Sequence, residues 1–254
     1  MEPGLCEYLS WDSDLFQLRI GRLKPARLTR ETLCAAEHWC HRERIDCLYF
    51  LAELDDFPTL TVAEEHDFRL VDVRATLEAR LRDRTEAPAP GAPSLVRRFR
   101  EEDIPALREL ARVSHRDSRF YFDPRFPDEL CGRLYETWID KSCRGWADAV
   151  FVADLGTGPV GYATARRVSD TAGDLGLMAV DAQAQGRGLG RQLAAAVLDW
   201  GRRERLDTVH VVTQGRNCPA MRMYAHSGFL PRTLQLWYHR WFSLPDPGVQ
   251  HGRL

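Results

Sequence analysis

One glycine-rich segment constrains the fold of this chain more than any other. Residues 177–191 read Leu-Met-Ala-Val-Asp-Ala-Gln-Ala-Gln-Gly-Arg-Gly-Leu-Gly-Arg. The apolar run Leu175–Val180 predicts a strand, and apolar residues at three- and four-residue steps from Leu189 to Trp200 predict a helix. A strand, a glycine loop and a helix in this order indicate an α/β fold that binds a phosphate group.

The glycines of this loop explain how it would bind phosphate. Gly186, Gly188 and Gly190 allow positive φ and let a ligand approach the backbone closely. The N–H groups of the loop and of the first helical turn lie at the positive end of the helix dipole. Arg187 and Arg191 add positive charge. The loop therefore predicts a pyrophosphate site at the start of the helix.

Three phosphate-binding patterns can be compared with this loop. A Walker loop ends in Gly-Lys-Ser/Thr, which is absent here. A dinucleotide fingerprint has its third glycine where Arg191 stands. The pattern Gln-x-x-Gly-x-Gly, with Gln185, Gly188 and Gly190, resembles the acetyl-coenzyme A loop of the GNAT superfamily of N-acetyltransferases. An ordinary strand-to-helix turn is the alternative, and the flanking strand and amphipathic helix favour the cofactor site.

Composition excludes several other classes of protein. The net charge of −2 argues against a nucleic-acid partner or an anionic membrane surface. Apolar runs are too short to span a bilayer, and the first residues do not resemble a secretory signal. The 7 cysteines contain no Cys-x-x-Cys pair, so we expect a reducing, cytoplasmic location. Cys34, His38 and His41 with Cys47 are an alternative metal set, but their spacing favours a packed helix, and we predict no metal site.

Turn and linker signals divide the chain into four parts. We expect a small α/β domain at 1–81, a Pro- and Ala-rich linker at 82–94, a second domain at 95–242 and a tail at 243–254. In the first domain the pattern predicts strands at 5–9, 18–23, 47–52 and 69–81, helices at 29–44 and 60–66, and a turn at 11–14.

The second domain has a longer series of elements. Strands are expected at 96–99, 149–153, 160–168, 175–180, 208–213 and 230–241, and helices at 101–113, 128–141, 189–200 and 217–228, with an irregular stretch at 114–127. The order β-α-α-β-β-β-α-β-α-β resembles the GNAT topology. The resemblance implies a mixed, mostly antiparallel central sheet flanked by helices. The smaller N-terminal domain has a similar order and is interpreted as a reduced copy of one GNAT half.

The resemblance also implies where the cofactor lies. In GNAT folds the strand before the loop separates from its neighbour, and its N–H groups contact the pantetheine and the thioester carbonyl as an oxyanion hole. The residues implied to bind acetyl-CoA are Met178, Ala179, Val180, Gln185, Gly186, Arg187, Gly188, Leu189, Gly190, Arg191, Asn217 and Tyr224.

Tyr224 is the predicted catalytic residue. It follows Asn217 by seven residues and resembles the GNAT tyrosine that faces the sulfur of coenzyme A. A phenol has a pKa of about 10 and a thiol of about 8.5, so a hydrogen bond to the departing thiolate is favoured over full proton transfer. Packing against Met221 is the alternative role of this ring. The base that deprotonates the amine stays open among His115, His210, His239, Asp174 and Glu136.

The stretch Ser114–Pro124 is the predicted acceptor loop. Arginines form two-pronged hydrogen bonds with phosphate oxygens, and aromatic rings stack on bases. Arg116, Arg119 and Tyr121 therefore favour a small-molecule acceptor that is anionic and aromatic, such as a nucleotide sugar. A surface loop with packed aromatic residues is the alternative.

Further motifs narrow the resemblance. Ser118-Arg119-Phe120 with Asp123-Pro124, Tyr135–Ile139, Val212–Gly215, Leu236–Trp241 and the N-terminal Leu9–Ser13 with Phe16 together resemble the TDP-fucosamine acetyltransferase family. That family acetylates the 4-amino group of a dTDP-linked deoxysugar, and the resemblance implies a homodimer. Gln17 and Asp67 depart from the family pattern. The alternatives are a GNAT enzyme for another amine (a peptide N-terminus, lysine, polyamine or aminoglycoside) and a non-catalytic acyl-CoA-binding module.

Overall fold

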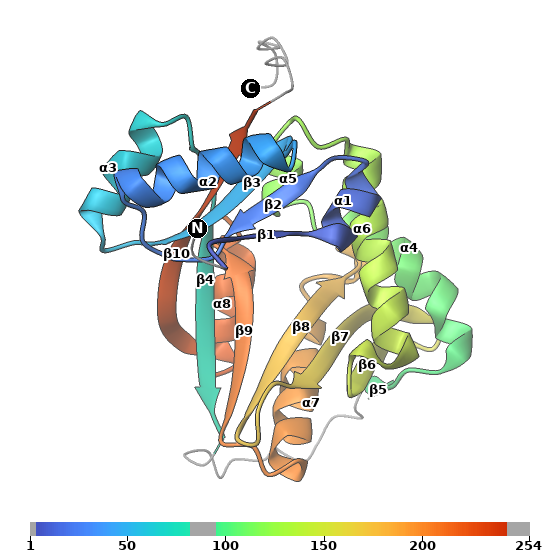
Figure 1. Cartoon of the computed structure of the whole chain (residues 1–254). Helices are drawn as coiled ribbons and strands as arrows, with labels where there is room; N and C mark the ends of the chain where they lie inside the picture. The colour runs from blue at the N-terminus through green and yellow to red at the C-terminus, as the bar shows by residue number, and fades with distance from the viewer. Residues whose placement is uncertain (1–3, 82–94, 243–254) are drawn as a thin grey trace. The chain divides into compact units, whose positions relative to one another are not determined.

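The structure is a computed structural model that describes residues 4–81 and 95–242 (Figure 1). The chain forms two compact units, each gathered from segments that are distant in the sequence. Of the described residues, unit 1 contains 4–74, 117–130 and 234–242, and unit 2 contains 75–81, 95–116 and 131–233. The predicted linker 82–94 and tail 243–254 lie outside the described residues. The spatial units do not coincide with the domains predicted at 1–81 and 95–242, and that division stays a prediction.

Unit 1 is built on strands that are neighbours in the order β1-β2-β3-β10. β1 pairs antiparallel with β2, β2 pairs parallel with β3, and β3 pairs antiparallel with β10. The strands of this unit are β1 (Cys6–Tyr8), β2 (Ile20–Leu23), β3 (Cys47–Glu53), the first part of β4 (Arg69–Arg80) and the second part of β10 (Leu230–Trp241). Its helices are α1 (Ser10–Phe16), α2 (Arg30–Arg42), α3 (Phe57–Glu65) and the short α5 (Arg119–Phe122).

Helix α2 forms because its sequence gives it both a cap and an apolar stripe. The Thr29 hydroxyl accepts the backbone N–H of Thr32 at 3.2 Å and satisfies one donor of the first turn. Leu33, Ala36 and Cys40 recur at helical spacing and are buried in the core of unit 1. The predicted helix over 29–44 is confirmed, with small differences at its ends.

The predicted turn at 11–14 is wrong, because these residues lie inside helix α1. The Ser13 hydroxyl accepts the backbone N–H of Ile20 at 3.0 Å, and Phe16 packs against Phe120 and Phe126. The Asp and Ser residues favour a turn locally, but long-range packing of Phe16 decides the conformation. In the stretch expected to be irregular, residues 119–122 form the single turn of α5.

Unit 2 holds the longer series of strands, in the order β4-β9-β8-β7-β6-β5. β8 pairs parallel with β9, and the pairs β7–β8, β6–β7 and β5–β6 are antiparallel. The strands are β5 (Val96–Arg98), β6 (Ala149–Asp154), β7 (Pro159–Arg167), β8 (Ala172–Val180) and β9 (Thr208–Gln214), with the ends of β4 and β10 that belong to this unit. The predicted mixed, mostly antiparallel sheet is confirmed.

Helices cover both faces of this sheet. They are α4 (Ile104–Ser114), α6 (Asp128–Lys141), α7 (Leu189–Arg203) and α8 (Cys218–His226), with short turns η1 (Glu101–Asp103), η2 (Ser142–Trp146) and η3 (Ala182–Ala184). Figure 1 shows α7 behind the sheet and α4 in front of it. Leu189, Leu193, Val197 and Trp200 of α7 are buried in the core of unit 2, as their spacing predicts.

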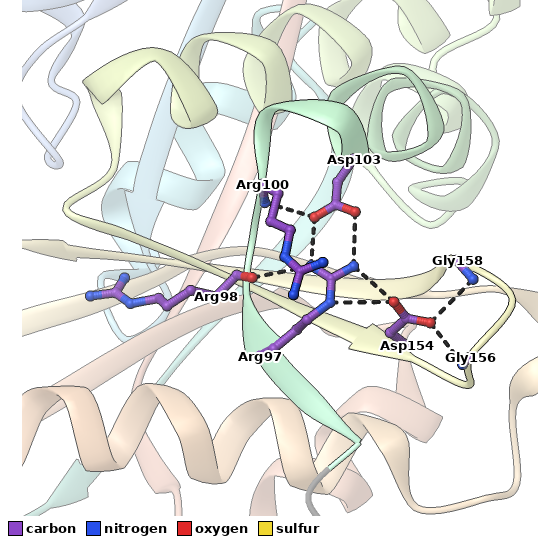
Figure 2. Close-up of polar contacts among 7 residues, drawn as sticks. All are labelled: Arg97, Arg98, Arg100, Asp103, Asp154, Gly156 and Gly158. Carbon is purple, nitrogen blue, oxygen red and sulfur yellow. Dashed lines mark hydrogen bonds and ion pairs between the residues drawn. The ribbon is translucent and has the colours of Figure 1, made fainter.

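A charged network fastens the edge of unit 2 (Figure 2). The Arg97 guanidinium donates to Asp103 at 2.7 and 2.9 Å and to Asp154 at 2.8 Å. Asp154 also accepts the backbone N–H groups of Gly156 and Gly158 at 2.8 and 3.1 Å. These contacts hold strand β5, the start of α4 and the β6–β7 turn in one arrangement.

Within residues 4–81 and 95–242, no helix combines the length and the apolar character needed to cross a bilayer. Cys34 and His38 lie one turn apart on α2, where His38 Nδ1 is 2.8 Å from the Cys34 carbonyl oxygen. No group of three or more potential metal ligands occurs in the described part of the chain.

Candidate active site

Strands β8 and β9 separate in unit 2. Their parallel pairing runs from Ala172 opposite Thr208 to Leu175 opposite Val211 and then stops. β8 nevertheless continues to Val180, and β9 to Gln214. Figure 1 shows the two arrows diverging toward their ends. The β8 edge that faces β9 is therefore unpaired with it beyond Leu175.

The ladder on the other side of β8 determines which groups face this fork. Asp181 donates its N–H to the Val160 carbonyl at 2.8 Å, and Leu177 donates its N–H to the Thr164 hydroxyl at 2.8 Å. Because antiparallel backbone groups alternate in direction, the N–H groups of Met178 and Val180 face the fork and that of Ala179 faces β7. Nothing in the sequence distinguishes Thr164, whose hydroxyl replaces a ladder partner where the β7–β8 register shifts.

The glycine loop follows directly and leads into α7. Gly186 and Gly188 have φ of 77° and 76°, in the left-handed region that favours glycine. In the described part of the chain, no heavy atom apart from those of Gly186 and its two chain neighbours lies within 4 Å of the position that a Cβ on Gly186 would take. No side chain caps α7, so its first-turn N–H groups remain available to an anion. The exposed Arg187 and Arg191 flank this end, and the loop fits a pyrophosphate.

Two other predicted residues shape the loop by different contacts. Gln185 donates its side-chain amide to the Val180 carbonyl at 3.2 Å and so ties the loop to the end of β8. Leu189 is buried in the core, so only its backbone can meet a ligand. Gly190 lies beside Met223, whose Cγ is 3.5 Å from an added Cβ, and this contact joins the start of α7 to α8.

Helix α8 carries Asn217 and Tyr224. The Asn217 side-chain oxygen accepts the N–H of Ala220 at 3.1 Å and caps the helix, which leaves its amide NH₂ to meet a ligand. Tyr224 is buried, and its ring packs edge-on against Phe229 with centroids 5.6 Å apart. Among the described residues the Tyr224 hydroxyl has no hydrogen-bond partner. Burial raises the pKa of Tyr224 well above its ordinary value, so the hydroxyl stays protonated and remains a donor.

One core brings these pieces together. Leu189 and Tyr224 belong to the hydrophobic core of unit 2, and Met178, Val180 and Met223 pack against it. The fork, the glycine loop and the tyrosine are thus neighbours in a single unit, and the arrangement has the chemistry to hold an acyl thioester with its phosphates on α7.

The predicted acceptor residues are divided between the units. Arg116 is exposed in unit 2, whereas Arg119 and the half-buried Tyr121 belong to unit 1. The Arg119 guanidinium carbon lies 4.8 Å from the Tyr49 ring centroid, 4.1 Å from that of Phe120 and 4.4 Å from that of Trp237. Tyr49 was not expected at this position, because nothing in its apolar strand distinguishes it from a core residue.

Of the five groups considered as bases, three are committed to other contacts. His239 is fully buried in unit 1, where its Nδ1 lies 2.8 Å from Asp123 and burial lowers its pKa to about 4. Glu136 accepts two bonds from the Arg108 guanidinium. His115 stacks on Tyr135, its Nε2 lies 2.7 Å from the Tyr162 hydroxyl, and burial lowers its pKa to about 4.

The other two groups stand side by side just below the fork. Asp174 and His210 are register partners on β8 and β9, one step before the last pair, and His210 Nδ1 lies 3.7 Å from Asp174. His210 Nε2 also lies 3.1 Å from the Glu78 carboxylate, which forms an ion pair with Arg232 at 2.7 Å. Asp174, His210 and Glu78 are half-buried and Arg232 is exposed. Nothing in the sequence connects the four strands that carry them.

Comparison with known proteins agrees with this geometry. Residues 104–229 match the model of the acetyltransferase (GNAT) family. Residues 104–229 form a GNAT acetyltransferase domain. Acetyl-CoA is the acetyl donor of GNAT acetyltransferases. The GNAT domain includes the fork, the glycine loop and Tyr224, so the predicted GNAT fold is confirmed.

Relatives of the chain include enzymes named for sugar chemistry. It is 33% identical over 142 residues to the dTDP-fucosamine acetyltransferase of Escherichia coli O6:H1, covering 55% of this chain and 60% of that protein. It is 29% identical over 139 residues to the spore coat polysaccharide biosynthesis protein SpsD of Bacillus subtilis, covering 55% of this chain and 48% of that protein. The matches therefore span less than two thirds of these relatives.

A solved structure shares the fold beyond the GNAT domain. The GCN5-related N-acetyltransferase from Sphaerobacter thermophilus superposes with a TM-score of 0.67 at 16% identity, covering 93% of this chain and 76% of that one. The likeness is one of fold and extends over both units.

Proposed function

We propose that the protein is an acetyl-CoA-dependent N-acetyltransferase that acts on the amino group of a nucleotide-linked amino-deoxysugar, of the dTDP-4-amino-4,6-dideoxyhexose type. The observation that carries the proposal is the common core of the fork, the glycine loop and Tyr224. The names of the E. coli and B. subtilis relatives support a sugar acceptor.

Each part of the site has a task in this reaction. Acetyl-CoA supplies the acetyl group as a thioester. The first-turn N–H groups of α7, with Arg187 and Arg191, would bind its pyrophosphate. The N–H groups of Met178 and Val180 would bind the thioester carbonyl oxygen, where negative charge develops. The Asn217 amide would hold the pantetheine.

Tyr224 acts where the bond breaks. As the amine nitrogen attacks the carbonyl carbon, the C–S bond breaks and charge appears on sulfur. The protonated Tyr224 hydroxyl would donate a hydrogen bond that strengthens as this charge grows. The proton of the amine leaves to a base or to water, and the acetamide and coenzyme A are the products.

A thiol-release assay over a panel of amines tests this function. We expect release with dTDP-4-amino-4,6-dideoxyhexoses and none with peptides, polyamines or aminoglycosides. Release with one of those other amines alone would overturn the sugar acceptor and retain the enzyme. Coenzyme A binding without release from any amine would indicate a non-catalytic acyl-CoA-binding module. A homodimer and a cytoplasmic location stay predictions.

A further inference from the structure

Three segments that are far apart in the sequence meet around Arg119 in unit 1. Arg119 begins the short helix α5, Tyr49 belongs to β3 and Trp237 belongs to β10. The register places Trp237 opposite Leu51, two residues beyond Tyr49 on β3. Asp12 of α1 is the fourth contributor, since its charge interacts with that of Arg119. The guanidinium of Arg119 therefore lies among aromatic rings that belong to three separate elements, β3, α5 and β10.

The contacts of Arg119 are unusual for a half-buried arginine. The rings of Tyr49, Phe120 and Trp237 lie within 4.8 Å of its guanidinium carbon. In residues 4–81 and 95–242 its side chain forms no hydrogen bond and no ion pair. By contrast, Arg240 also lies over aromatic rings, of Phe68 and Phe242, but pairs with Glu37 at 2.6 Å.

Aromatic stacking leaves the donors of a guanidinium unused. The rings around Arg119 offer no oxygen or nitrogen acceptor in these contacts, and the five N–H groups of a guanidinium need such acceptors. Arg119 Nε is buried and has no hydrogen-bond partner among the described residues, while the residue as a whole is half-buried. A partly buried positive charge without an acceptor is costly, and an anion that met the terminal nitrogens would remove that cost.

We propose that Arg119, held between Tyr49, Phe120 and Trp237, is the core of an oxyanion-binding site in unit 1. The ligand is a phosphate or carboxylate group that receives a two-pronged hydrogen bond from the terminal nitrogens. Trp237 is half-buried beside it and can contact the ring to which the oxyanion is attached.

Asp12 narrows the chemistry of the ligand. It is half-buried, and its negative charge interacts with the positive charges of Arg119 and Arg22. Among the described residues it forms no ion pair with Arg119. A carboxylate beside the oxyanion would repel a bare multivalent anion but accept a hydrogen bond from a hydroxyl or amine. The site therefore fits an oxyanion attached to a hydroxyl-bearing group, as in a nucleotide or a sugar acid.

Calorimetric titration of the full chain tests the site directly. The probes are dTDP and dTMP for phosphate, glucuronate for carboxylate, inorganic phosphate for a bare anion, and thymidine for a nucleoside without an oxyanion. We expect dTDP or glucuronate to bind and thymidine and inorganic phosphate to bind much more weakly. Arg119→Gln should weaken the binding about 10- to 100-fold, and Arg119→Lys, which keeps the charge without the planar fork, should recover only part of it.

Arg98→Gln is the matched control, because Arg98 also lies over an aromatic ring, that of Phe151, but is exposed in unit 2. Arg98→Gln should bind dTDP and glucuronate as tightly as the unmodified protein does, and coenzyme A affinity should be the same in all variants. The site would be overturned if both Arg119 variants bound dTDP and glucuronate as tightly as the unmodified protein does. It would also be overturned if thymidine or inorganic phosphate bound tightly and dTDP and glucuronate did not.

The inference rests on the proposed function only for the identity of the ligand. Loss of dTDP binding in Arg119→Gln, without acetylation of any nucleotide sugar, would support the oxyanion site and overturn the proposed acceptor. Acetylation of a nucleotide sugar with an unchanged KM in Arg119→Gln would support the proposed acceptor and overturn the oxyanion site.

Discussion

At the scale of single residues, the hydroxyl of Tyr224 is the group on which turnover should depend. Because burial keeps this phenol protonated, Tyr224→Phe removes a hydrogen-bond donor and little volume. We expect kcat to fall roughly 100-fold and coenzyme A affinity, measured by calorimetry, to stay nearly constant. Tyr238→Phe in unit 1 makes the same chemical change at a tyrosine that is not among the predicted cofactor residues, and it should retain full kcat. Equal kcat in Tyr224→Phe would contradict the assignment.

His115 predicts a loss of stability in acid. Its folded-state pKa of about 4 lies below the value of about 6.5 expected in the unfolded chain. As the pH falls, the unfolded state therefore binds the proton first. The free energy of unfolding keeps its full value with respect to His115 above about pH 6.5 and decreases as the pH falls toward 4, by about 3 kcal/mol at most. His239 has a pKa shift of the same sign and acts in the same direction.

Urea unfolding between pH 4.5 and 7.5 measures this effect. His115→Phe keeps a ring on Tyr135 but removes the titrating group, so its free energy of unfolding should vary less with pH. Its absolute stability should be lower at pH 7.5, because the buried Tyr162 hydroxyl loses its partner. Parallel pH curves for the two proteins would show that His115 does not titrate in this way.

At the scale of elements, the glycine loop should be sensitive at Gly188. With φ of 76°, this residue begins α7 in a conformation that costs roughly 1–2 kcal/mol for a residue with a Cβ. Gly188→Ala should lower stability by about that amount and weaken coenzyme A binding roughly tenfold, because the Cβ stands at the anion-binding end of the helix.

Gly158 offers the matched control for this substitution. It has φ of 113° and open space around an added Cβ, but it lies in the β6–β7 turn. Gly158→Ala should therefore cost similar stability while coenzyme A affinity is unchanged. Equal losses of coenzyme A affinity in both variants would indicate a general effect of strain.

The elements differ in how well the sequence predicts them. Helix α7 and its loop are predictable, because Leu189, Leu193 and Trp200 repeat at helical spacing and the glycines mark the turn. Helix α1 is not, because the burial of Phe16 against Phe120 and Phe126 is a contact between distant segments. The fork between β8 and β9 could be predicted only from the family resemblance, because no residue of β8 indicates that the pairing ends at Leu175.

The candidate site shows the same limit. The loop residues and Tyr224 form a local pattern, so spacing is enough to predict them as cofactor residues. In unit 2, Thr164 and Glu78 make their contacts through pairing or packing between distant strands, and in unit 1 Tyr49 does the same. Each has an ordinary strand sequence around it, so local patterns do not distinguish these residues.

At the scale of the whole molecule, the way each unit is assembled predicts that the chain cannot be cut at its linker. Residues 235–241 of β10 pair one by one with β3, and Phe120 and Phe126 pack on Phe16. A fragment of residues 95–254 would expose an unpaired strand edge and an aromatic cluster. We expect it to aggregate, and residues 1–81 expressed together with it should restore a monodisperse protein in size-exclusion chromatography.

The opposite result would support the predicted domain boundary. A monodisperse fragment 95–254 that unfolds cooperatively in urea would show that residues 95–242 fold independently. Coenzyme A binding by that fragment would place all determinants of cofactor affinity outside residues 1–81.

The direction of the Met178 and Val180 amides has a consequence for genetics. A main-chain donor survives every codon change except one to proline, so the other substitutions in a saturation screen over these two positions would record little beyond tolerance for size and polarity. Only proline, or an ester bond introduced by chemical synthesis, deletes the donor itself. Apart from the proline substitutions, the proposed contacts with the acetyl carbonyl would therefore leave no trace in a map of mutational effects.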